Sequence, residues 1–76
     1  MKTLEEFTEL FAEQFDETEK SEITSITNFR DLEEWSSIIG MSVMAMVSQE
    51  FGVILSADDI RKSNTPNDIY NIIKSK

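Results

Sequence analysis

The chain has 76 residues, of which 39% are hydrophobic, and its formal net charge is −8. This balance argues against nucleic-acid binding, because phosphate contacts need Lys and Arg, and the seven that are present are scattered. The chain lacks Cys and His, which excludes a disulfide framework, native thiol chemistry and a Ser-His-Asp hydrolase.

The first predicted element is a helix over residues 3–16. The segment from Thr3 to Glu6 has the pattern of a capping box, in which the Thr3 hydroxyl accepts from the Glu6 amide and the Glu6 side chain reaches back. Apolar residues then recur at helical spacing and predict the buried face of this helix. They are Leu4, Phe7, Leu10 or Phe11, and Phe15.

A polar loop over residues 16–28 follows, and loops of that length are uncommon and tend to be functional. Ile23 and Ile26 are isolated apolar residues in it, and we expect both to pin the loop onto the core. At its end, residues 29–32 are predicted to form one short turn that buries Phe29 and Leu32.

The second predicted helix runs from about Ser37 to Phe51 and ends at Gly52, a residue type favoured after helix C-termini. A count at 100° per residue places a core face along one side of this helix, with a polar arc opposite. The predicted core face comprises Val43, Val47 and Phe51, with Gly40 and Met44 beside them. The side chains expected to be exposed are Ser42, Ser48 and Gln49.

Three apolar residues, Ile38, Met41 and Ala45, fall in that polar arc. They are either scattered surface hydrophobic residues, which are normal, or a stripe that docks a partner. Met is well suited to the second role because its side chain is adaptable.

Two further helices complete the predicted fold. Ser56 is a good N-cap for a short third helix, and Thr65-Pro66 is a strong start signal for a last helix over residues 66–74. No strand is predicted. We therefore expect an all-α protein, a small four-helix bundle with three main helices and one short one. It should form a single domain over residues 1–76, in the cytoplasm and without membrane insertion.

Ser36 and Ser37 precede the Met-rich helix and are the candidate functional residues. A serine hydroxyl needs an adjacent base to act as a nucleophile, and the chain offers no His and no Lys near Ser37 in sequence, so we do not expect an enzyme. Two interpretations stay open at this point. The pair caps the second helix, or Ser37 is an exposed hydroxyl that another protein modifies.

Three segments of the chain resemble the acyl carrier protein family, and the resemblance covers nearly the whole chain. They are residues 29–38, the Met-rich stretch that closes with Glu50-Phe51-Gly52-Val53, and residues 64–69. The resemblance implies a bundle of acyl-carrier type with 4′-phosphopantetheine attached to Ser37, since the spacing from the family's serine to Phe51 fits Ser37 and not Ser36. Ser36 stands where the family usually has an Asp that contributes to recognition by the phosphopantetheinyl transferase.

By this resemblance, the protein is an acyl carrier that holds acyl intermediates as thioesters for fatty-acid, polyketide or related biosynthesis. The alternatives are an aminoacyl or D-alanyl carrier, which the segment 64–67 resembles locally, and an acidic protein-binding module without a prosthetic group. The implied partners are a phosphopantetheinyl transferase and acyl-activating, acyl-transfer or synthase enzymes, acting on a monomer.

The resemblance also implies which residues face those partners. Many carriers display acidic residues along helix two, where this chain has Ile39, Ser42, Ser48 and Gln49. A more apolar docking surface is therefore expected. Members of the family differ in whether the bundle shelters part of the cargo, and Met44 and Met46 are the residues that would line such a shelter here. The predicted partner-contacting residues are Ser36, Ile38, Met41, Ala45, Glu33 and Glu34.

Overall fold

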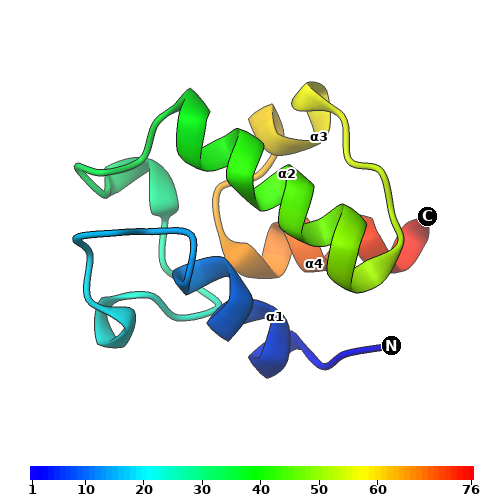
Figure 1. Cartoon of the computed structure of the whole chain (residues 1–76), viewed down its shortest axis with the longest axis horizontal. Helices are drawn as coiled ribbons and strands as arrows, with labels where there is room; N and C mark the ends of the chain where they lie inside the picture. The colour runs from blue at the N-terminus through cyan, green and yellow to red at the C-terminus, as the bar shows by residue number, and fades with distance from the viewer.

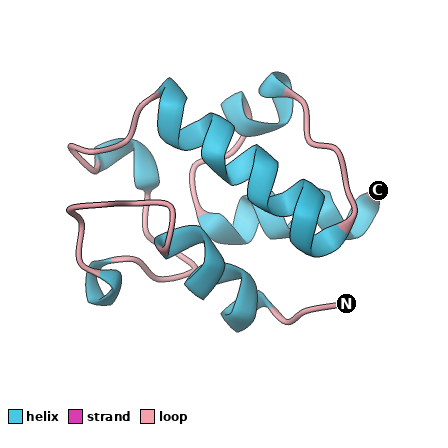
Figure 2. Cartoon of the chain, viewed as in Figure 1, coloured by secondary structure: helices cyan, strands magenta, loops and turns pink.

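The computed structural model describes all 76 residues and contains four α-helices, two short 3-10 helices and no strand (Figures 1 and 2). The predicted all-α fold, with three longer helices and one short one, is confirmed. The helices are α1 (Leu4–Ala12), η1 (Lys20–Glu22), η2 (Phe29–Asp31), α2 (Ser37–Phe51), α3 (Ala57–Arg61) and α4 (Pro66–Ser75). None of them is both long enough and apolar enough to span a bilayer.

Reciprocal capping boxes start three of the four helices. The box was predicted at Thr3, and Ser56 and Thr65 were predicted as N-caps without it. At α1 the Glu6 amide donates to Thr3 Oγ1 at 3.1 Å, and the Thr3 amide donates to Glu6 Oε1 at 2.8 Å. Ser56 with Asp59 at α3 and Thr65 with Asp68 at α4 repeat this arrangement. Each box satisfies amides that have no partner inside their own helix, so these three starts are encoded locally.

The predicted end of the first helix at residue 16 is wrong, because α1 ends at Ala12. The chain continues in tighter turns, in which Gln14 N donates to Phe11 O and Phe15 N donates to Ala12 O. These turns leave the helical path but keep Phe15 buried against the ring of Phe11, 5.5 Å away between centroids. The hydrophobic spacing therefore predicted the burial of Phe15 and not the helix end.

One hydrophobic cluster of 14 buried side chains joins the four helices and the long first loop. In Figure 1, α2 crosses the molecule, with α1 below it and α4 behind. The rings of Phe7, Phe11 and Phe29 are fully buried, and Phe29 lies 4.3 Å from Trp35 between ring centroids. This aromatic cluster fixes the segment that leads into α2.

The long first loop is held by one of its two predicted apolar anchors. Ile23 is 5% exposed, but Ile26 is 78% exposed, so the prediction for Ile26 is wrong. Thr24 and Thr27 close a tight turn, with Thr27 N donating to Thr24 O, and Ile26 lies at its outer corner. At the end of the loop Phe29 is buried as predicted, whereas Leu32 is only partly buried.

The face of α2 that enters the core is wider than predicted. Val43 and Val47 are fully buried, and Ile39 and Met46 join them, since these four positions follow the i, i+4, i+7, i+8 spacing of one helical stripe. Ile39 was placed on the partner-facing side, and that prediction is wrong. The predicted core residues Phe51 and Met44 are only partly buried, although both pack against the core.

The polar arc of α2 also differs from the prediction at one position. Ser48 and Gln49 are exposed as expected, but Ser42 is partly buried. Its hydroxyl donates to Gln14 Oε1 at 2.9 Å, because Gln14 reaches across from the turn that follows α1.

Candidate functional site

The two adjacent serines at the start of α2 have different roles in the fold. Ser36 is the N-cap, with extended backbone, and its Oγ accepts from the Ile39 amide at 3.4 Å. Ser37 is the first residue of the helix and is exposed, and its hydroxyl makes no hydrogen bond within the chain. The capping requirement of α2 is thus met by Ser36. Ser37 keeps a free hydroxyl that faces solvent.

Trp35 holds the chain immediately before the serines. Its indole packs on Phe29 and lies stacked near Phe11, with centroids 6.4 Å apart and 19° between the ring planes. The Trp35 amide donates to Leu32 O at 3.1 Å. Because the residue two positions before Ser37 is anchored in the core, the serine is presented from a defined backbone position.

Glu34 fastens the long first loop to this same segment. Its carboxylate accepts from the amides of Asp16, Glu17 and Thr18 and from the Thr18 hydroxyl, at distances between 2.6 and 3.2 Å. Desolvation of the carboxylate opposes ionisation, but the hydrogen bonds from Thr18 and from these amides outweigh it and lower the pKa of Glu34. The carboxylate predicted to face partners is therefore engaged inside the fold.

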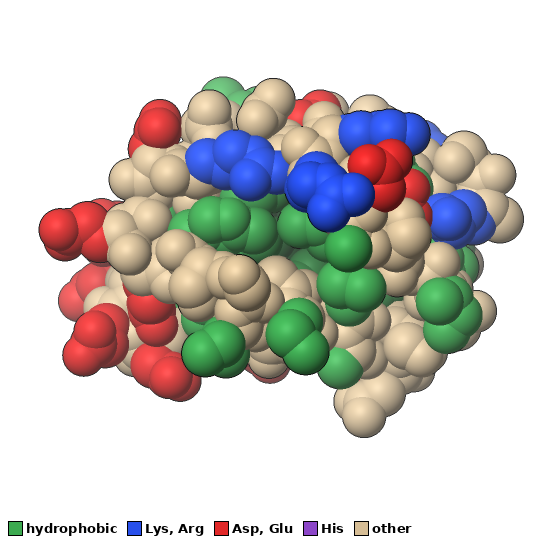
Figure 3. Space-filling model, turned by 90° about the horizontal axis from the view of Figure 1, so that it is seen from above, with side chains coloured by type: hydrophobic (Ala, Val, Ile, Leu, Met, Phe, Trp, Pro, Cys, Tyr) green, Lys and Arg blue, Asp and Glu red, His purple; other side chains and the backbone are tan.

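An open groove of about 430 Å³ lies beside Ser37, between α2 and α3. Figure 3 shows it from above as a hollow among hydrophobic side chains, with Lys and Arg along one edge. It is lined by Arg30, Trp35, Ser36, Ser37, Gly40, Met41, Met44, Ala57, Ile60 and Arg61. The groove combines an apolar interior with the two candidate serines and two guanidinium groups.

Gly40 keeps this groove open. A Cβ at this position would lie 3.7 Å from the Trp35 ring and 3.9 Å from Ile60 Cγ2, which are ordinary contact distances. The close helix packing that a glycine inside a helix suggests is therefore not required here. The absent side chain instead leaves space over the indole of Trp35.

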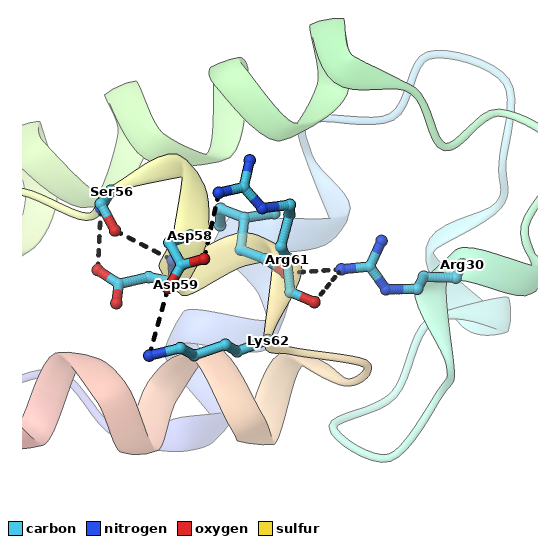
Figure 4. A network of polar contacts seen from close by, with 7 residues as sticks. Arg30, Ser56, Asp58, Asp59, Arg61 and Lys62 are labelled. Carbon is cyan, nitrogen blue, oxygen red and sulfur yellow. Dashed lines mark hydrogen bonds and ion pairs between the residues drawn. The ribbon is translucent and has the colours of Figure 1, made fainter.

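Arg30 fixes the α3 wall of the groove, a role that sequence reasoning missed. Its Nη2 donates to Ile60 O at 2.7 Å and Arg61 O at 3.0 Å (Figure 4). Its Nε donates to Ser63 O at 3.0 Å. These carbonyls end the short helix α3, where a cation is electrostatically favourable. No local sequence signal identifies this contact, because its partners lie 30 to 33 residues further along the chain.

The predicted partner-contacting residues surround Ser37 without forming one uniform surface. Ile38 is 77% exposed and Met41 is 67% exposed, and Ala45 is also exposed. Ser36 and Glu33 are exposed, whereas Glu34 is partly buried. Of the two methionines predicted beside the cargo, Met44 lines the groove and Met46 is buried in the core.

The family described as phosphopantetheine attachment site matches residues 5–73, which is all but the two ends of the chain. No curated protein and no solved structure gave a match. Domains of this family carry 4′-phosphopantetheine covalently on a serine, are generally not catalytic themselves, and work with a phosphopantetheinyl transferase and with acyl-handling enzymes. The exposed serines at the start of α2 and the small helical fold agree with that description. The chain therefore belongs to the phosphopantetheine-binding family of carrier domains, to which the acyl carrier proteins also belong.

Proposed function

We propose that this protein is an acyl carrier that holds acyl intermediates as thioesters on a phosphopantetheine arm attached to Ser37. The pathway would be fatty-acid, polyketide or related biosynthesis. Support comes from one observation above all: in a chain of this family, Ser37 has an exposed hydroxyl with no partner, while the hydroxyl of Ser36 is used as the helix cap.

The surroundings of Ser37 fit a phosphodiester. The N-terminus of a helix carries a partial positive charge, and α2 is 15 residues long with no acidic residue in its first turn. A negative group on Ser37 Oγ is therefore favoured by the helix dipole and meets no like charge within that turn. The groove beside it offers an apolar surface to whatever the arm carries.

The chain's own chemistry in this scheme is limited to offering one hydroxyl. Ser37 Oγ would form the bond to phosphorus and lose its proton, while the pyrophosphate bond of the coenzyme A donor breaks and the nucleotide leaves as adenosine 3′,5′-bisphosphate. The chain has no His, and no carboxylate is hydrogen-bonded to Ser37, so we assign the base to the transferase. The bound group supplies a terminal thiol that the chain, which has no Cys, does not have. What the fold contributes is presentation, through the Ser36 cap and the Trp35 anchor.

Intact-protein mass spectrometry after co-expression with a phosphopantetheinyl transferase tests this proposal. We expect one phosphopantetheine adduct that disappears in Ser37→Ala and persists in Ser36→Ala. Loss of the adduct only in the Ser36 variant would show that the other serine is the attachment site. Absence of an adduct with every transferase tested would favour a protein-binding module without a prosthetic group. Ser36→Asp, which restores the family's usual residue, should raise the modification rate.

The surface around Ser37 supports contacts with those enzymes. We infer that Ile38, Met41 and Ala45 form the apolar part of a docking surface, since they are exposed and follow Ser37 along the first two turns of α2. Ser36, Glu33 and Glu34 would border it. We propose that the protein acts as a monomer in the cytoplasm, and light scattering on the purified protein tests the monomer.

An aminoacyl or D-alanyl carrier is the second candidate function. It is favoured by the start of α4, where the segment from Asn64 to Asn67 is locally similar to D-alanyl carriers. In the structure Thr65 forms a capping box with Asp68, and the Asn67 amide donates to Ser25 O at 2.9 Å. Loading assays with amino-acid-activating and acyl-activating enzymes, each on the phosphopantetheine-bearing protein, separate the two candidates.

A further inference from the structure

The groove beside Ser37 has a charge opposite to that of the whole protein. Two of its lining residues, Arg30 and Arg61, are cationic, and no Asp or Glu lines it. The chain as a whole has 15 acidic and seven basic side chains, so a groove without a carboxylate is unusual here. In Figure 3 the basic side chains border the hydrophobic hollow, while most acidic side chains in view gather at one end of the molecule.

Neither arginine has its charge fully balanced within the chain. The hydrogen bonds of Arg30 go only to backbone carbonyls, from Nε and Nη2, and its guanidinium lies 5.4 Å from the centre of the Phe29 ring. Arg30 forms no ion pair, and its Nη1 amino group makes no hydrogen bond within the chain. Arg61 shares one carboxylate with its neighbour: Arg61 Nη2 lies 3.1 Å from Asp58 Oδ1, and Lys62 Nζ lies 3.3 Å from Asp58 Oδ2 (Figure 4). With Lys62 on Asp58, the Arg61 guanidinium is available to a second anion, and its side chain is 71% exposed.

We propose that the groove accepts an acyl group that ends in a carboxylate, carried on the arm at Ser37. This inference rests on the proposed function. The apolar part of the acyl group would lie against Trp35, Met44 and Ile60, which line the groove. Its carboxylate would form an ion pair with Arg61 at the rim, and the positive charge of Arg30 would also attract it. A guanidinium suits this role because its planar array of donors matches the two oxygens of a carboxylate.

The volume of the groove fits a short acyl group. Ligand pockets commonly enclose about 300 to 1,000 Å³, and this groove, at about 430 Å³, lies near the lower limit and is open to solvent. Because the rim is exposed, water screens the charge pair, and we expect a several-fold preference over a neutral cargo rather than exclusion of one.

Trp35 provides the readout, since it lines the groove and is the only tryptophan in the chain. The protein would be loaded from coenzyme A thioesters by a transferase that tolerates acylated substrates. Three forms are compared: the arm without cargo, the arm with a hexanoyl group, and the arm with an adipoyl group, which has the same number of carbons and ends in a carboxylate. Quenching of Trp35 fluorescence by acrylamide measures how often the groove is covered.

We expect the ratio of covered to open grooves to be about three-fold higher with adipoyl than with hexanoyl cargo. Arg61→Gln should remove this difference. Lys74→Gln is the matched control, because Lys74 is also cationic but does not line the groove and forms no ion pair, and it should preserve the difference. High salt should reduce the adipoyl form to the level of the hexanoyl form.

Equal quenching of the two acylated forms would overturn the proposal, as would equal effects of Arg61→Gln and Lys74→Gln. If Arg61→Gln changes the form without cargo as much as the adipoyl form, the anion at Arg61 is the phosphodiester of the arm, and the proposal is again wrong. Mass spectra recorded before the fluorescence measurement separate these outcomes from failure of the proposed function. Absence of any adduct on Ser37 would overturn that function and this inference together.

Discussion

Thr18 donates twice to Glu34: its amide and its hydroxyl each lie 2.8 Å from Glu34 Oε1. Together with the amides of Asp16 and Glu17, they surround one carboxylate with donors from the loop that follows α1. This contact joins two segments 16 to 18 residues apart in sequence, immediately before the site serines. In the sequence Glu34 looks like an ordinary surface charge, but in the fold its carboxylate connects the loop after α1 to the segment before α2.

Replacing Glu34 with Gln should lower the melting temperature at neutral pH. The hydrogen bonds to the ionised carboxylate lower its pKa in the folded protein, so its stabilising contribution is fully present above the ordinary glutamate value of about 4.5. That contribution is lost as the pH falls through the lower folded value. Thermal melts across this range should therefore show the wild type approaching Glu34→Gln in acid. Glu33→Gln, an exposed neighbour, should melt like the wild type at every pH; equal losses in both variants would contradict the connector role.

Removing the Arg30 side chain should destabilise the fold more than removing the nearby Arg61 side chain. Arg30→Gln loses three charge-assisted hydrogen bonds to carbonyls at the end of α3, and we expect a loss of about 1–2 kcal/mol in the free energy of unfolding. Arg61→Gln loses only one exposed ion pair, which water screens, so we expect a much smaller loss. Urea denaturation measures both values. Similar losses would show that the contacts of Arg30 add nothing beyond surface charge.

The two glycines should respond in opposite directions to substitution by Ala. Gly40 has room for a Cβ and lies inside α2, so Gly40→Ala should stabilise the protein by about 0.5–1 kcal/mol. Gly52 ends α2 with φ of +66°, a left-handed conformation that other residues adopt at a cost, so Gly52→Ala should destabilise it by about 1 kcal/mol. Thermal or urea denaturation gives the sign of each change. A destabilising Gly40→Ala would mean that the Trp35 ring has no freedom to accommodate the added methyl group.

Replacing Met41 with Glu should impair modification of the protein without unfolding it. Met41 is 67% exposed and adjoins Ser37, so a charge there would disturb an apolar docking contact while changing stability by less than about 0.5 kcal/mol. We expect the kcat/KM of the transferase to fall about ten-fold, the effect of losing a contact worth about 1.4 kcal/mol. Gln49→Glu, exposed near the far end of α2, is the matched control and should have little effect. A large decrease in melting temperature would instead place Met41 in the core.

Local chemistry explains what could be predicted from the sequence alone. The residues Thr3 and Glu6, and likewise Thr65 and Pro66, predicted helix starts, because the residues of each start signal lie within one helical turn of each other. The helical period similarly predicted that Val43 and Val47 face the core, and that Ile38 and Met41 do not. The two serines at the start of α2 were recognised as the candidate site, with Ser37 selected by family resemblance.

Only the tertiary structure decided where long-range partners meet. Turns decide where α1 ends, at Ala12, and why Ile26 points outward. The contacts of Glu34 with Thr18 and of Arg30 with α3 join residues far apart in the chain. Periodicity carries no information about such pairs. The same reason applies to the groove, whose two arginines come from η2 and α3 and meet Trp35 and the serines of α2 only when the helices pack. The sequence alone led to Ser37 as the proposed attachment site, and packing created the apolar, positively charged surface beside it.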